Sequence, residues 1–366
     1  MFENTYKNKT VLVTGHTGFK GSWLSAWLTT LGAKVVGISI NVPSSPSNYE
    51  ASEVNKLAKD IRIDITDLEC LKDTMKQYQP DFVFHLAAQA LVRSSYDDPL
   101  STLTINAIGS ANVLESLRYL DKQVVAVMIT SDKAYDNVEW VWGYRETDKL
   151  GGKDPYSASK GMAELAIHSY VSSFFSSPDS NVRVGITRAG NVIGGGDWAK
   201  DRIVPDCMSA WSLGEIVDIR SPDATRPWQH VLEPLSGYLA LGVELHNSNK
   251  FHGEAYNFGP PASQNHSVKE LIDEMNEYWE NVRWNDISKD ETHLHEAGLL
   301  KLNCDKSLHY LDWLPTLNFD DTVRMTVEWY KYFYQNKGVS MQNFTLGQID
   351  EYTNFARTRG MKWAEI

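Results

Sequence analysis

The stretch Thr10–Leu24, TVLVTGHTGFKGSWL, decides the fold of this chain. Its first five residues are apolar or β-branched, which predicts a buried strand. Gly15, Gly18 and Gly21 follow at three-residue intervals, and 22–31 then has the composition of a helix. A strand, a glycine-rich turn and a helix in this order are typical of a dinucleotide-binding βαβ unit.

The three glycines predict a phosphate site. A side chain at these positions would keep the backbone away from a pyrophosphate, and the helix that follows offers free N–H groups and the positive end of its dipole. The cofactor contacts expected on this loop are Gly15, Thr17, Gly18, Phe19 and Gly21. A tight turn that binds nothing is the alternative, and the flanking strand and helix make it the weaker one.

Strands and helices alternate along the following residues. Apolar runs predict strands at 34–40, 61–64, 81–86, 124–130 and 182–187, and amphipathic segments predict helices at 68–78 and about 100–120. Continuous apolar strands separated by helices imply a parallel sheet covered on both faces. We therefore expect an α/β fold, a doubly wound parallel Rossmann sheet, with ligands bound at the carboxyl ends of its strands.

The second half of the chain has a different character. Tryptophans recur after residue 190, prolines punctuate turns, and 268–279 and 320–334 have helical spacing. We predict a dinucleotide-binding domain over 1–190, with later parts of the sheet contributed from about 215–260. A smaller substrate-binding lobe is expected mainly over 191–340, followed by a C-terminal tail over 341–366.

The composition narrows the class of partner. A net charge of −12 argues against nucleic acid or an anionic membrane surface as the main partner. No apolar run approaches the roughly 20 residues that span a bilayer. Cys70, Cys207 and Cys304 lie far apart with no CxxC pairing, which indicates a reduced, cytoplasmic protein without a structural metal site. An anionic substrate would have to be bound by local arginines.

Tyr156 and Lys160 lie four residues apart, a spacing that puts them on one face of a helix. A free phenol has a pKa of about 10, and a neighbouring ammonium favours the phenolate. Such a pair can take the proton of a sugar hydroxyl while hydride leaves the same carbon. Ser131, at the end of the strand predicted over 124–130, can steady that hydroxyl. Tyr-xxx-Lys is common by chance, but the glycine loop and this serine favour the catalytic interpretation.

These motifs together resemble the extended short-chain dehydrogenase/reductase family. The resembling residues extend from about Lys9 to Tyr334 and are Gly15-xx-Gly18-xx-Gly21, Leu86-Ala87-Ala88, Asn106, Ser131, Tyr156-xxx-Lys160 and Arg188-Ala-Gly-Asn-Val192. The longer strings GHTGFKGSWL, TSDKAY and GGGDWAKDRIVPD are more specific. They resemble those members of the family that remove water from a nucleotide-linked glucose.

The resemblance implies an activity, a cofactor and an assembly. The implied reaction is that of a hydro-lyase: oxidation at C4 of the hexose of CDP-glucose, elimination of water across C5–C6, and return of the hydride to C6. The implied cofactor is NAD, and the implied assembly is a homodimer or homotetramer formed through the helices that begin near Leu100 and Tyr156. The usual destination of such products is deoxysugar for cell-surface polysaccharide, such as the O-antigen of lipopolysaccharide.

The residues past the glycine loop favour NAD mildly on their own. An acid that binds ribose is expected about 20 residues beyond the glycines, and this chain has Ser39, Ile40 and Asn41 there, with no arginine for a 2′-phosphate. Asp64, with Ile65, is expected to meet the adenine, although capping of the next helix is an equal alternative for Asp64. Small side chains at 86–88 (Leu86, Ala87, Ala88) would let the cofactor lie against the end of the next strand.

An acid and an amine follow Ser131 directly. The resemblance assigns Asp132 as the acid that helps the C6 hydroxyl to leave, whereas Lys133 stands where related thymidine-linked dehydratases carry a glutamate base. Three roles for Lys133 are open: a neutral amine that acts as base, a cation that stabilises the enolate, or an ion-pair partner of Asp132. Burial would raise the pKa of Asp132 and Lys133 would lower it, and the sequence does not decide the balance.

Cations must converge on a diphosphate in this acidic chain. Arg202 and Arg226 resemble the family's phosphate contacts, and a guanidinium donates two parallel hydrogen bonds to phosphate. The other substrate contacts that we predict are Gln89, Arg93, Asn191 and His230. Surface salt bridges are the alternative for the arginines, and a packed polar side chain is the alternative for His230. The choice of cytosine rests on the resemblance alone.

Two rival functions are weaker. An NAD-dependent nucleotide-sugar 4-epimerase shares the loop and the Tyr–Lys pair, but it has no elimination to perform and gives Asp132 no task. A dinucleotide-sensing regulator on the same fold has no use for Ser131, Tyr156 and Lys160 together.

Overall fold

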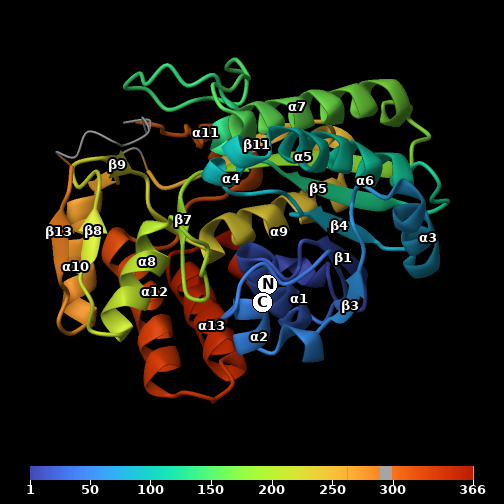
Figure 1. Ribbon diagram of the computed structural model, residues 1–366. Coiled ribbons are helices and arrows are strands. Elements are labelled where there is room, and N and C mark those ends of the chain that lie inside the picture. Colours follow the sequence, from blue (N-terminus) through green and yellow to red (C-terminus); the bar gives the residue numbers. More distant parts are fainter. Residues whose placement is uncertain (262, 289–298, 366) are drawn as a thin grey trace.

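The computed structural model describes residues 1–261, 263–288 and 299–365 (Figure 1). Within these residues, seven parallel strands form the central sheet in the order β11-β6-β5-β4-β1-β2-β3. Their bounds are β1 Thr10–Thr14, β2 Lys34–Ser39, β3 Lys59–Arg62, β4 Phe82–His85, β5 Val124–Ile129, β6 Val182–Ala189 and β11 Ala255–Phe258. The order reverses between β1 and β4, which confirms the predicted doubly wound sheet and marks the edge where such folds bind ligands.

Helices cover both faces of the sheet, as the continuous apolar strands predict. Val11 and Val13 of β1 join one core with α1 (Phe19–Thr30) and α9 (Leu232–Asn247). Leu12, between them, joins the other core with α3, α6 and α7. The bounds on that face are α3 Leu68–Tyr78, α4 Val92–Asp97, α5 Pro99–Leu103, α6 Gly109–Leu117 and α7 Pro155–Tyr170. Figure 1 shows α5, α6 and α7 above the sheet and α1 below it.

A π-helical turn interrupts one helix that the sequence pattern predicted as continuous. The segment expected at about 100–120 consists of α5, a π-helical turn at Thr104–Ile108 and α6. A second such turn, Val171–Phe175, extends α7. Single π turns inside helices are frequently found at functional sites because they re-aim a side chain. Here the first turn carries Asn106.

Strand and helix ends differ slightly from the predicted ones. The third strand was expected at 61–64 but pairs over Lys59–Arg62, because Ile38 of β2 sets its register opposite Ile61. Three of its four residues, Lys59, Asp60 and Arg62, are charged, so an apolar pattern does not predict where this strand begins. The first helix begins at Phe19 instead of Ser22, with Gly18 as its N-cap.

The smaller lobe is built from helices and two-stranded sheets (Figure 1, left side). Its helices are α8 Ile203–Ser212, α10 Val268–Tyr278 and α12 Phe319–Gln335. Two further helices pack against the sheet domain: α11 Asp305–Leu311 beside β11 and α9, and α13 Gln342–Thr358 beside α1. The strands of the lobe are β7 Val192–Ile193, β8 Val217–Ile219, β9 Thr225–Arg226, β10 Gln229–His230, β12 His266–Ser267 and β13 Trp284–Asp286. The short α2 (Asn48–Ala51) lies beside α1.

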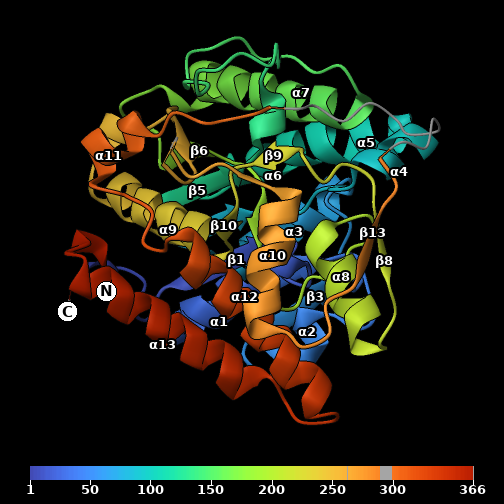
Figure 2. The same cartoon turned by 90° about the vertical axis from the view of Figure 1, so that its left-hand side faces the viewer.

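The last helix, α13, returns to the Rossmann core and crosses the molecule near the N-terminus (Figure 2). Tyr352 packs edge-on against Trp27 of α1 and donates a 2.8 Å hydrogen bond to Glu233 of α9. The C-terminal segment is therefore part of the core. No helix among the described residues is long and apolar enough to cross a membrane.

Candidate active site

The three glycines of the loop between β1 and α1 meet three separate requirements. Gly15 has a φ of +74°, and a Cβ there would lie 2.7 Å from the Ala87 nitrogen at the end of β4. A Cβ on Gly21 would lie 2.0 Å from the Gly15 carbonyl oxygen, so close packing of α1 on the loop excludes it. Gly18 caps α1, and its Cβ would meet only that same oxygen, at 3.3 Å. The free approach over Gly18 fits a pyrophosphate at the helix N-terminus.

The other loop residues hold the end of β2. The Thr17 hydroxyl donates a 2.6 Å hydrogen bond to the Asn41 carbonyl oxygen. Ser39 faces inward, with its Oγ 3.0 Å from His16 Nδ1 and accepting from the Thr17 amide. The Ser39 hydroxyl is thus engaged by the protein, whereas Ile40 and Asn41 stay exposed. Phe19 turns toward Gly194, at the base of the smaller lobe.

Asp64 and Ile65 follow β3. Asp64 Oδ1 accepts a 2.8 Å hydrogen bond from the Thr66 amide, and Asp67 is the N-cap of α3. The N-cap of α3 is thus Asp67 and not Asp64, and one carboxylate oxygen of Asp64 is instead used by the turn between β3 and α3. Ile65 is buried in the core over α6, where Gly109 leaves room for its side chain. Contact of the two residues with adenine stays a prediction.

The segment after β4 is fixed by amide side chains. Leu86, Ala87 and Ala88 lead to Gln89, whose side chain accepts from the Leu91 amide and donates to Thr102 Oγ1. Asn106, on the π turn, accepts from the Gln89 amide at 2.8 Å and donates to Ser159 Oγ at 2.8 Å. Asn106 thereby joins the loop after β4 to α7. The Gln89 side chain is hydrogen-bonded within this loop and to α5, and its contact with a sugar stays a prediction.

The structure brings the predicted catalytic residues together at the carboxyl end of β5. Ser131 is the N-cap of a short helical turn, Asp132–Ala134, and its hydroxyl donates a 3.0 Å hydrogen bond to Asp132 Oδ1. A Cβ added to Gly190 would lie 3.0 Å from Asp132 Oδ2, so Asp132 faces the end of β6. Ser131 and Asp132 both act electrostatically on Tyr156 of α7.

Burial dominates the pKa of the tyrosine. It raises the pKa of Tyr156 to about 12, while hydrogen bonding to Ser131 and the charge of Arg202 oppose the rise. Lys160 lies with its Nζ 5.9 Å from the Tyr156 ring centroid, and burial lowers the pKa of this lysine to about 8. The spacing argument expected Lys160 to favour the phenolate. In the chain without a cofactor, the pKa of Tyr156 is raised and not lowered, because burial of the phenolate in an apolar environment dominates.

Burial also decides the direction in which the pKa of Asp132 shifts, which the sequence left open. Its carboxyl is 4% exposed, and loss of solvation raises its pKa, although Lys133, Ser131 and Lys20 act in the opposite direction. A raised pKa favours the protonated acid that can give a proton to a leaving hydroxyl. Lys133 is half-buried beside it, and its three possible roles stay open.

Lys20 is a site residue that the sequence analysis missed. It lies in the first turn of α1, and burial lowers its pKa to about 8, with charge effects from Arg202, Asp132 and Lys160. A lysine at this position was itself a signal, because the positive end of the helix dipole disfavours a cation there unless it has another task.

The arginines on the substrate side form ion pairs. Arg202 pairs with Asp197 at 2.7 Å, and Arg93 pairs with Asp201 at 2.7 Å across the two halves of the chain. Arg226 lies on β9 and donates to the Thr225 carbonyl oxygen, and Asn191 directly precedes β7. Both pairs leave the guanidinium groups of Arg93 and Arg202 partly exposed.

His230 takes the packed role that the sequence offered as its alternative. It is fully buried, its ring lies edge-on to Trp23, and burial lowers its pKa to about 3. A neutral imidazole can still donate one N–H, so contact of His230 with the substrate stays a prediction. Within the described ranges, no group of three or more His, Cys, Asp or Glu side chains is arranged to hold a metal ion.

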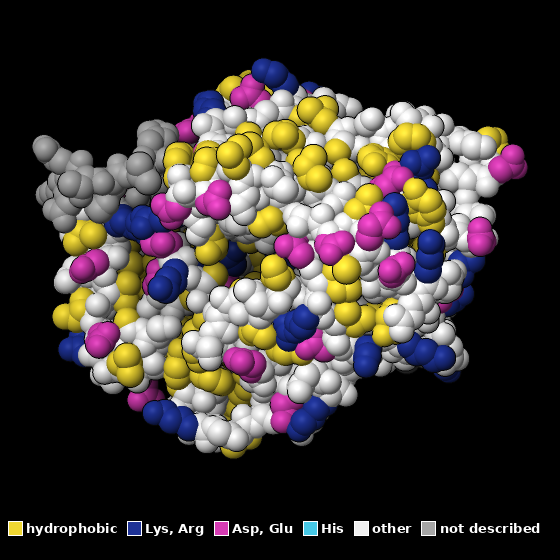
Figure 3. Space-filling view, turned by 45° about the vertical axis from the view of Figure 1, so that its right-hand side comes forward, with side chains coloured by type: hydrophobic (Ala, Val, Ile, Leu, Met, Phe, Trp, Pro, Cys, Tyr) yellow, Lys and Arg dark blue, Asp and Glu magenta, His cyan; other side chains and the backbone are white. Residues whose placement is uncertain are grey.

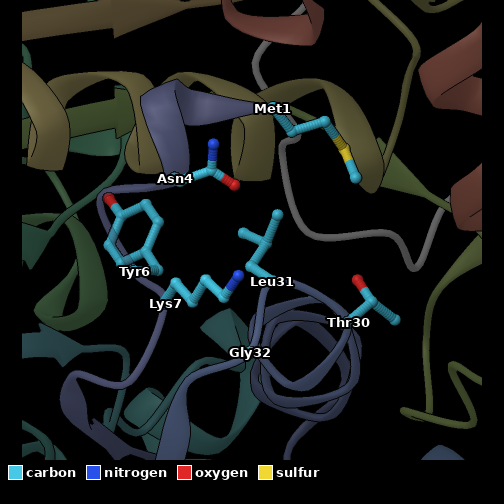
Figure 4. Close-up of a pocket in the computed structure, with 7 residues that line it drawn as sticks. All are labelled: Met1, Asn4, Tyr6, Lys7, Thr30, Leu31 and Gly32. Carbon is cyan, nitrogen blue, oxygen red and sulfur yellow. The ribbon is translucent and has the colours of Figure 1, made fainter. Parts of the chain in front are cut away.

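A separate cavity of about 240 Å³ lies at the opposite edge of the sheet (Figure 4). Its lining residues are Met1, Asn4, Tyr6, Lys7, Thr30, Leu31 and Gly32. They precede β1 and β2 and follow α1, which is the amino-terminal edge of the strands. The cavity is therefore distant from the catalytic cluster.

Comparison with known proteins agrees with this geometry. The family model of GDP-mannose 4,6 dehydratase matches residues 12–326. CDP-glucose 4,6-dehydratase of Salmonella typhimurium is 43% identical over 98% of this chain and 99% of that protein. Among solved structures, the epimerase Mth375 of Methanothermobacter thermautotrophicus has a TM-score of 0.76 at 26% identity, covering 91% of this chain and 95% of that chain.

A dehydratase shares the fold as well. DesIV, the dTDP-glucose 4,6-dehydratase of Streptomyces venezuelae solved with NAD and TYD bound, has a TM-score of 0.74 at 21% identity, covering 89% of this chain and 98% of that chain. The match of the family model spans most of the present sequence, including the glycine loop and the catalytic cluster. The chain therefore belongs to the GDP-mannose 4,6 dehydratase family.

Proposed function

We propose that this chain is a lyase that converts CDP-D-glucose to CDP-4-dehydro-6-deoxy-D-glucose and water, with NAD as its bound cofactor. The observation that carries the proposal is the cluster at the end of β5, where an acid and an amine follow Ser131 beside the Tyr156–Lys160 pair. The 43% identity to the Salmonella CDP-glucose 4,6-dehydratase supports the choice of cytidine.

The loop between β1 and α1 has the shape that a dinucleotide needs. The Gly18 N–H donates to the Gly15 carbonyl oxygen at 3.0 Å, so the pyrophosphate is proposed to lie over Gly18 and to be held by N–H groups of the first turn of α1, beginning with that of Phe19. The contacts proposed for the rest of the cofactor are Gly15, Thr17, Gly21, Asp64, Ile65, Leu86, Ala87, Ala88, Tyr156 and Lys160. When bound, NAD would accept the hydride of C4 and return it to C6, so that each turnover leaves it unchanged.

Oxidation at C4 needs a base for the hydroxyl proton. Tyr156 is the proposed base, and Ser131 orients the hydroxyl. Because burial holds the Tyr156 pKa at about 12, its phenolate needs positive charge nearby. Lys160 is the proposed source of that charge within the chain, with its own pKa lowered to about 8.

Elimination then breaks the C5–H and C6–O bonds. The 4-ketone makes the C5 proton acidic, and the C6 hydroxyl leaves as water if an acid protonates it. Asp132 is the proposed acid, because burial raises its pKa. Lys133 either removes the C5 proton as a neutral amine, stabilises the enolate as a cation, or holds Asp132 in place as an ion pair.

The diphosphate of the substrate is proposed to lie among the arginines of the smaller lobe. Arg202 is close enough to Tyr156 to influence its pKa, so a phosphate at Arg202 would bring the attached hexose toward the phenol. Arg226 and Asn191 are proposed to bind the same diphosphate, while Arg93 and Gln89 are proposed to contact the sugar.

The alternative is a nucleotide-sugar 4-epimerase, and the fold neighbour Mth375 is described as an epimerase. Epimerisation needs Ser131, Tyr156 and Lys160 but no acid near C6. The burial of Asp132 in a position that raises its pKa favours dehydration. The products distinguish the two, because only dehydration gives a 4-keto-6-deoxy sugar.

The same proposal includes a homodimer, or a homotetramer built from such dimers. Exposed apolar side chains lie along α5, its π turn and α7, among them Leu100 (75% exposed), Ile108 and Leu165 (63% exposed). Figure 3 shows a row of hydrophobic side chains over this upper layer. Contiguous apolar surface of this kind is typical of a protein interface. We also propose a cytoplasmic location and a role in deoxysugar supply for cell-surface polysaccharide such as O-antigen.

Product formation tests the proposed function. The purified protein with NAD is incubated with CDP-, dTDP-, UDP- and GDP-glucose in turn, and the 4-keto-6-deoxy sugar is measured by its absorbance in alkali. Rapid formation of the ketosugar from CDP-glucose is expected. A 4-epimer as the product would establish the alternative, and turnover of another nucleotide in preference would overturn the assignment of cytidine.

A further inference from the structure

The segment that follows β5 is held at both ends by one buried ion pair. Thr130, directly before Ser131, has its hydroxyl 2.7 Å from Glu164 Oε1. Tyr135, after the helical turn, accepts a 2.7 Å hydrogen bond from the Arg188 guanidinium. Glu164 and Arg188 pair with each other, and both are 0–1% exposed. The residues between Thr130 and Tyr135 are those proposed for the chemistry.

Further bonds of Arg188 and Tyr135 extend the restraint to β11. Arg188 Nε donates to Glu164 Oε1 at 2.7 Å, and its Nη1 also donates to the Glu146 carbonyl oxygen at 3.0 Å. The Tyr135 hydroxyl donates to Asn257 Oδ1 at 2.8 Å. The network therefore connects the end of β5 to α7, β6 and β11, the elements that surround the catalytic cluster.

A buried ion pair such as Glu164–Arg188 is not explained by stability alone. Two charges lose their hydration on burial, and apolar residues of the same volume are often as stable or more so. Here both charged groups are fully hydrogen-bonded, which makes the arrangement rigid. The rigidity has an evident use, because Glu164 lies one helical turn after Lys160 on the same face of α7.

We propose that Glu164, with Arg188 as its counter-ion, is a positioning residue that fixes the segment Ser131–Lys133 relative to Tyr156 and Lys160. Neither charged group is placed at the substrate, and both act through Thr130 and Tyr135. The inference rests on the proposed function, since the distance between Ser131 and the phenol matters only if both handle one sugar hydroxyl. Misplacement of a reacting group by about 1 Å can cost about 100-fold in rate.

Substitutions at Thr130 separate the hydrogen bond from packing. Thr130→Val keeps the shape of the side chain but removes the donor to Glu164. It is expected to lower kcat by about tenfold or more with KM changed by less than about twofold, because ground-state binding is untouched. Thr130→Ser keeps the donor and loses a methyl group, and its kcat is expected to stay within about twofold of the parent.

Tyr135→Phe tests the other end of the segment. The ring keeps its stacking on Tyr144, while the hydroxyl between Arg188 and Asn257 is lost. Its expected effect on kcat matches that of Thr130→Val. Tyr6→Phe is the matched control, since Tyr6 is equally buried and its hydroxyl donates to the Leu239 carbonyl oxygen far from the site. The control is expected to lose stability but not kcat.

Hydrogen exchange gives a readout that needs no turnover. In the protein with NAD, Thr130→Val and Tyr135→Phe are expected to raise amide exchange in peptides covering 131–135 by about tenfold, while Thr130→Ser and Tyr6→Phe leave these peptides unchanged. If the parent enzyme is inactive on every nucleotide sugar, the proposed function fails while the exchange result still decides the restraint. Exchange and kcat at parental levels in both test variants would overturn the inference, as would a Thr130→Ser variant as impaired as Thr130→Val.

Discussion

Burial moves three residues of the catalytic cluster toward their neutral forms. It raises the pKa of Tyr156 to about 12, raises that of Asp132, and lowers that of Lys160 to about 8. The direction differs because loss of solvation disfavours the charged form of each group, which is an anion for the acids and a cation for the lysine. Asp132 is therefore favoured in the protonated form that can donate to the leaving hydroxyl. Tyr156 needs positive charge from bound ligands to become the phenolate that acts as base.

The base function assigned to Tyr156 leads to the first prediction. Tyr156→Phe is expected to lower kcat by about 10²–10⁴-fold, the range that general acid–base catalysis contributes. The melting temperature should stay close to that of the parent, because the ring is buried and only its hydroxyl is lost. Ketosugar formation and thermal melting measure the two quantities. A variant with parental turnover would remove Tyr156 from the chemistry.

The position of Lys133 next to Asp132 leads to a second prediction. Lys133→Met is expected to lower the exchange of solvent deuterium into C5 by about tenfold or more, since a missing base or enolate partner slows loss of the C5 proton. The exchange is followed by mass spectrometry of recovered sugar. Exchange and turnover equal to those of the parent would leave Lys133 as an ion-pair partner without a chemical role.

At the scale of single elements, the start of α1 shows how one short segment meets several demands. The helix begins at Phe19 because Gly18 adopts an extended backbone as its N-cap. The same turn brings Gly15 against the end of β4 and Gly21 against Gly15. Sequence spacing predicted the turn, but the close contact with Ala87 depends on β4 lying next to β1. That neighbour comes from a segment some 70 residues away.

Two glycine substitutions separate cofactor approach from helix packing. A Cβ in Gly18→Ala would have one close neighbour, the Gly15 oxygen at 3.3 Å, so the fold should persist. The added methyl group would lie where the pyrophosphate is expected, so the Kd for NAD should rise about tenfold or more. Gly21→Ala places a Cβ 2.0 Å from that backbone oxygen and should lower the free energy of unfolding by about 1–3 kcal/mol. Chemical denaturation and NAD titration of both variants distinguish the effects. Equal losses of stability would contradict the two roles.

The junction of α9 with α13 leads to a prediction about pH. Glu233 is buried and accepts hydrogen bonds from the Thr316 and Leu317 amides and from Tyr352, and burial raises its pKa to about 7. Below pH of about 4.5 the folded and unfolded states both bind its proton. As pH rises to about 7 only the unfolded state loses it, so this group lowers the free energy of unfolding, by about 3 kcal/mol in all.

Glu233→Gln removes that titration. The free energy of unfolding of the variant, relative to the parent, is expected to rise by about 2–3 kcal/mol between pH 5 and pH 8. Urea denaturation at several pH values measures the difference, in which the contributions of other groups cancel. A difference that is constant over this range would show that Glu233 is ionised throughout.

At the scale of the whole molecule, the upper layer of helices carries the surface proposed for assembly. Met162 and Leu165 of α7 and Leu100 of α5 are exposed, and Figure 3 shows hydrophobic side chains gathered over this layer. On its other side, α7 contributes Ile167 to the core that covers the sheet. Apolar residues on both sides of a surface helix indicate two partners, one of which is the sheet.

Leu165→Lys tests the assembly. Leu165 is 63% exposed, so the charge costs little in the monomer but would be buried in a dimer formed through α7. The variant is expected to sediment as a monomer under conditions where the parent sediments as a dimer or tetramer. Leu213→Lys, at a leucine after α8 that is 73% exposed, is the control and should leave the assembly intact. A parent that is monomeric at all concentrations would remove the proposal.

The sequence by itself determined the features that depend on near neighbours. Apolar runs defined the strands of the sheet, three glycines defined the turn into α1, and a four-residue spacing placed Tyr156 and Lys160 on one face of α7. These patterns are readable because strand and helix periods and turn conformations are local properties of the backbone.

Only the tertiary structure decided what depends on residues distant in the chain. It brought Lys20 close enough to Asp132 to lower the pKa of that carboxyl, buried His230, and joined Glu164 and Arg188 in one network. It also set the pKa directions, which follow from the burial of each group and not from its adjacent residues. Burial and long-range pairing arise when the sheet and lobe pack together, and no window of the sequence contains both partners.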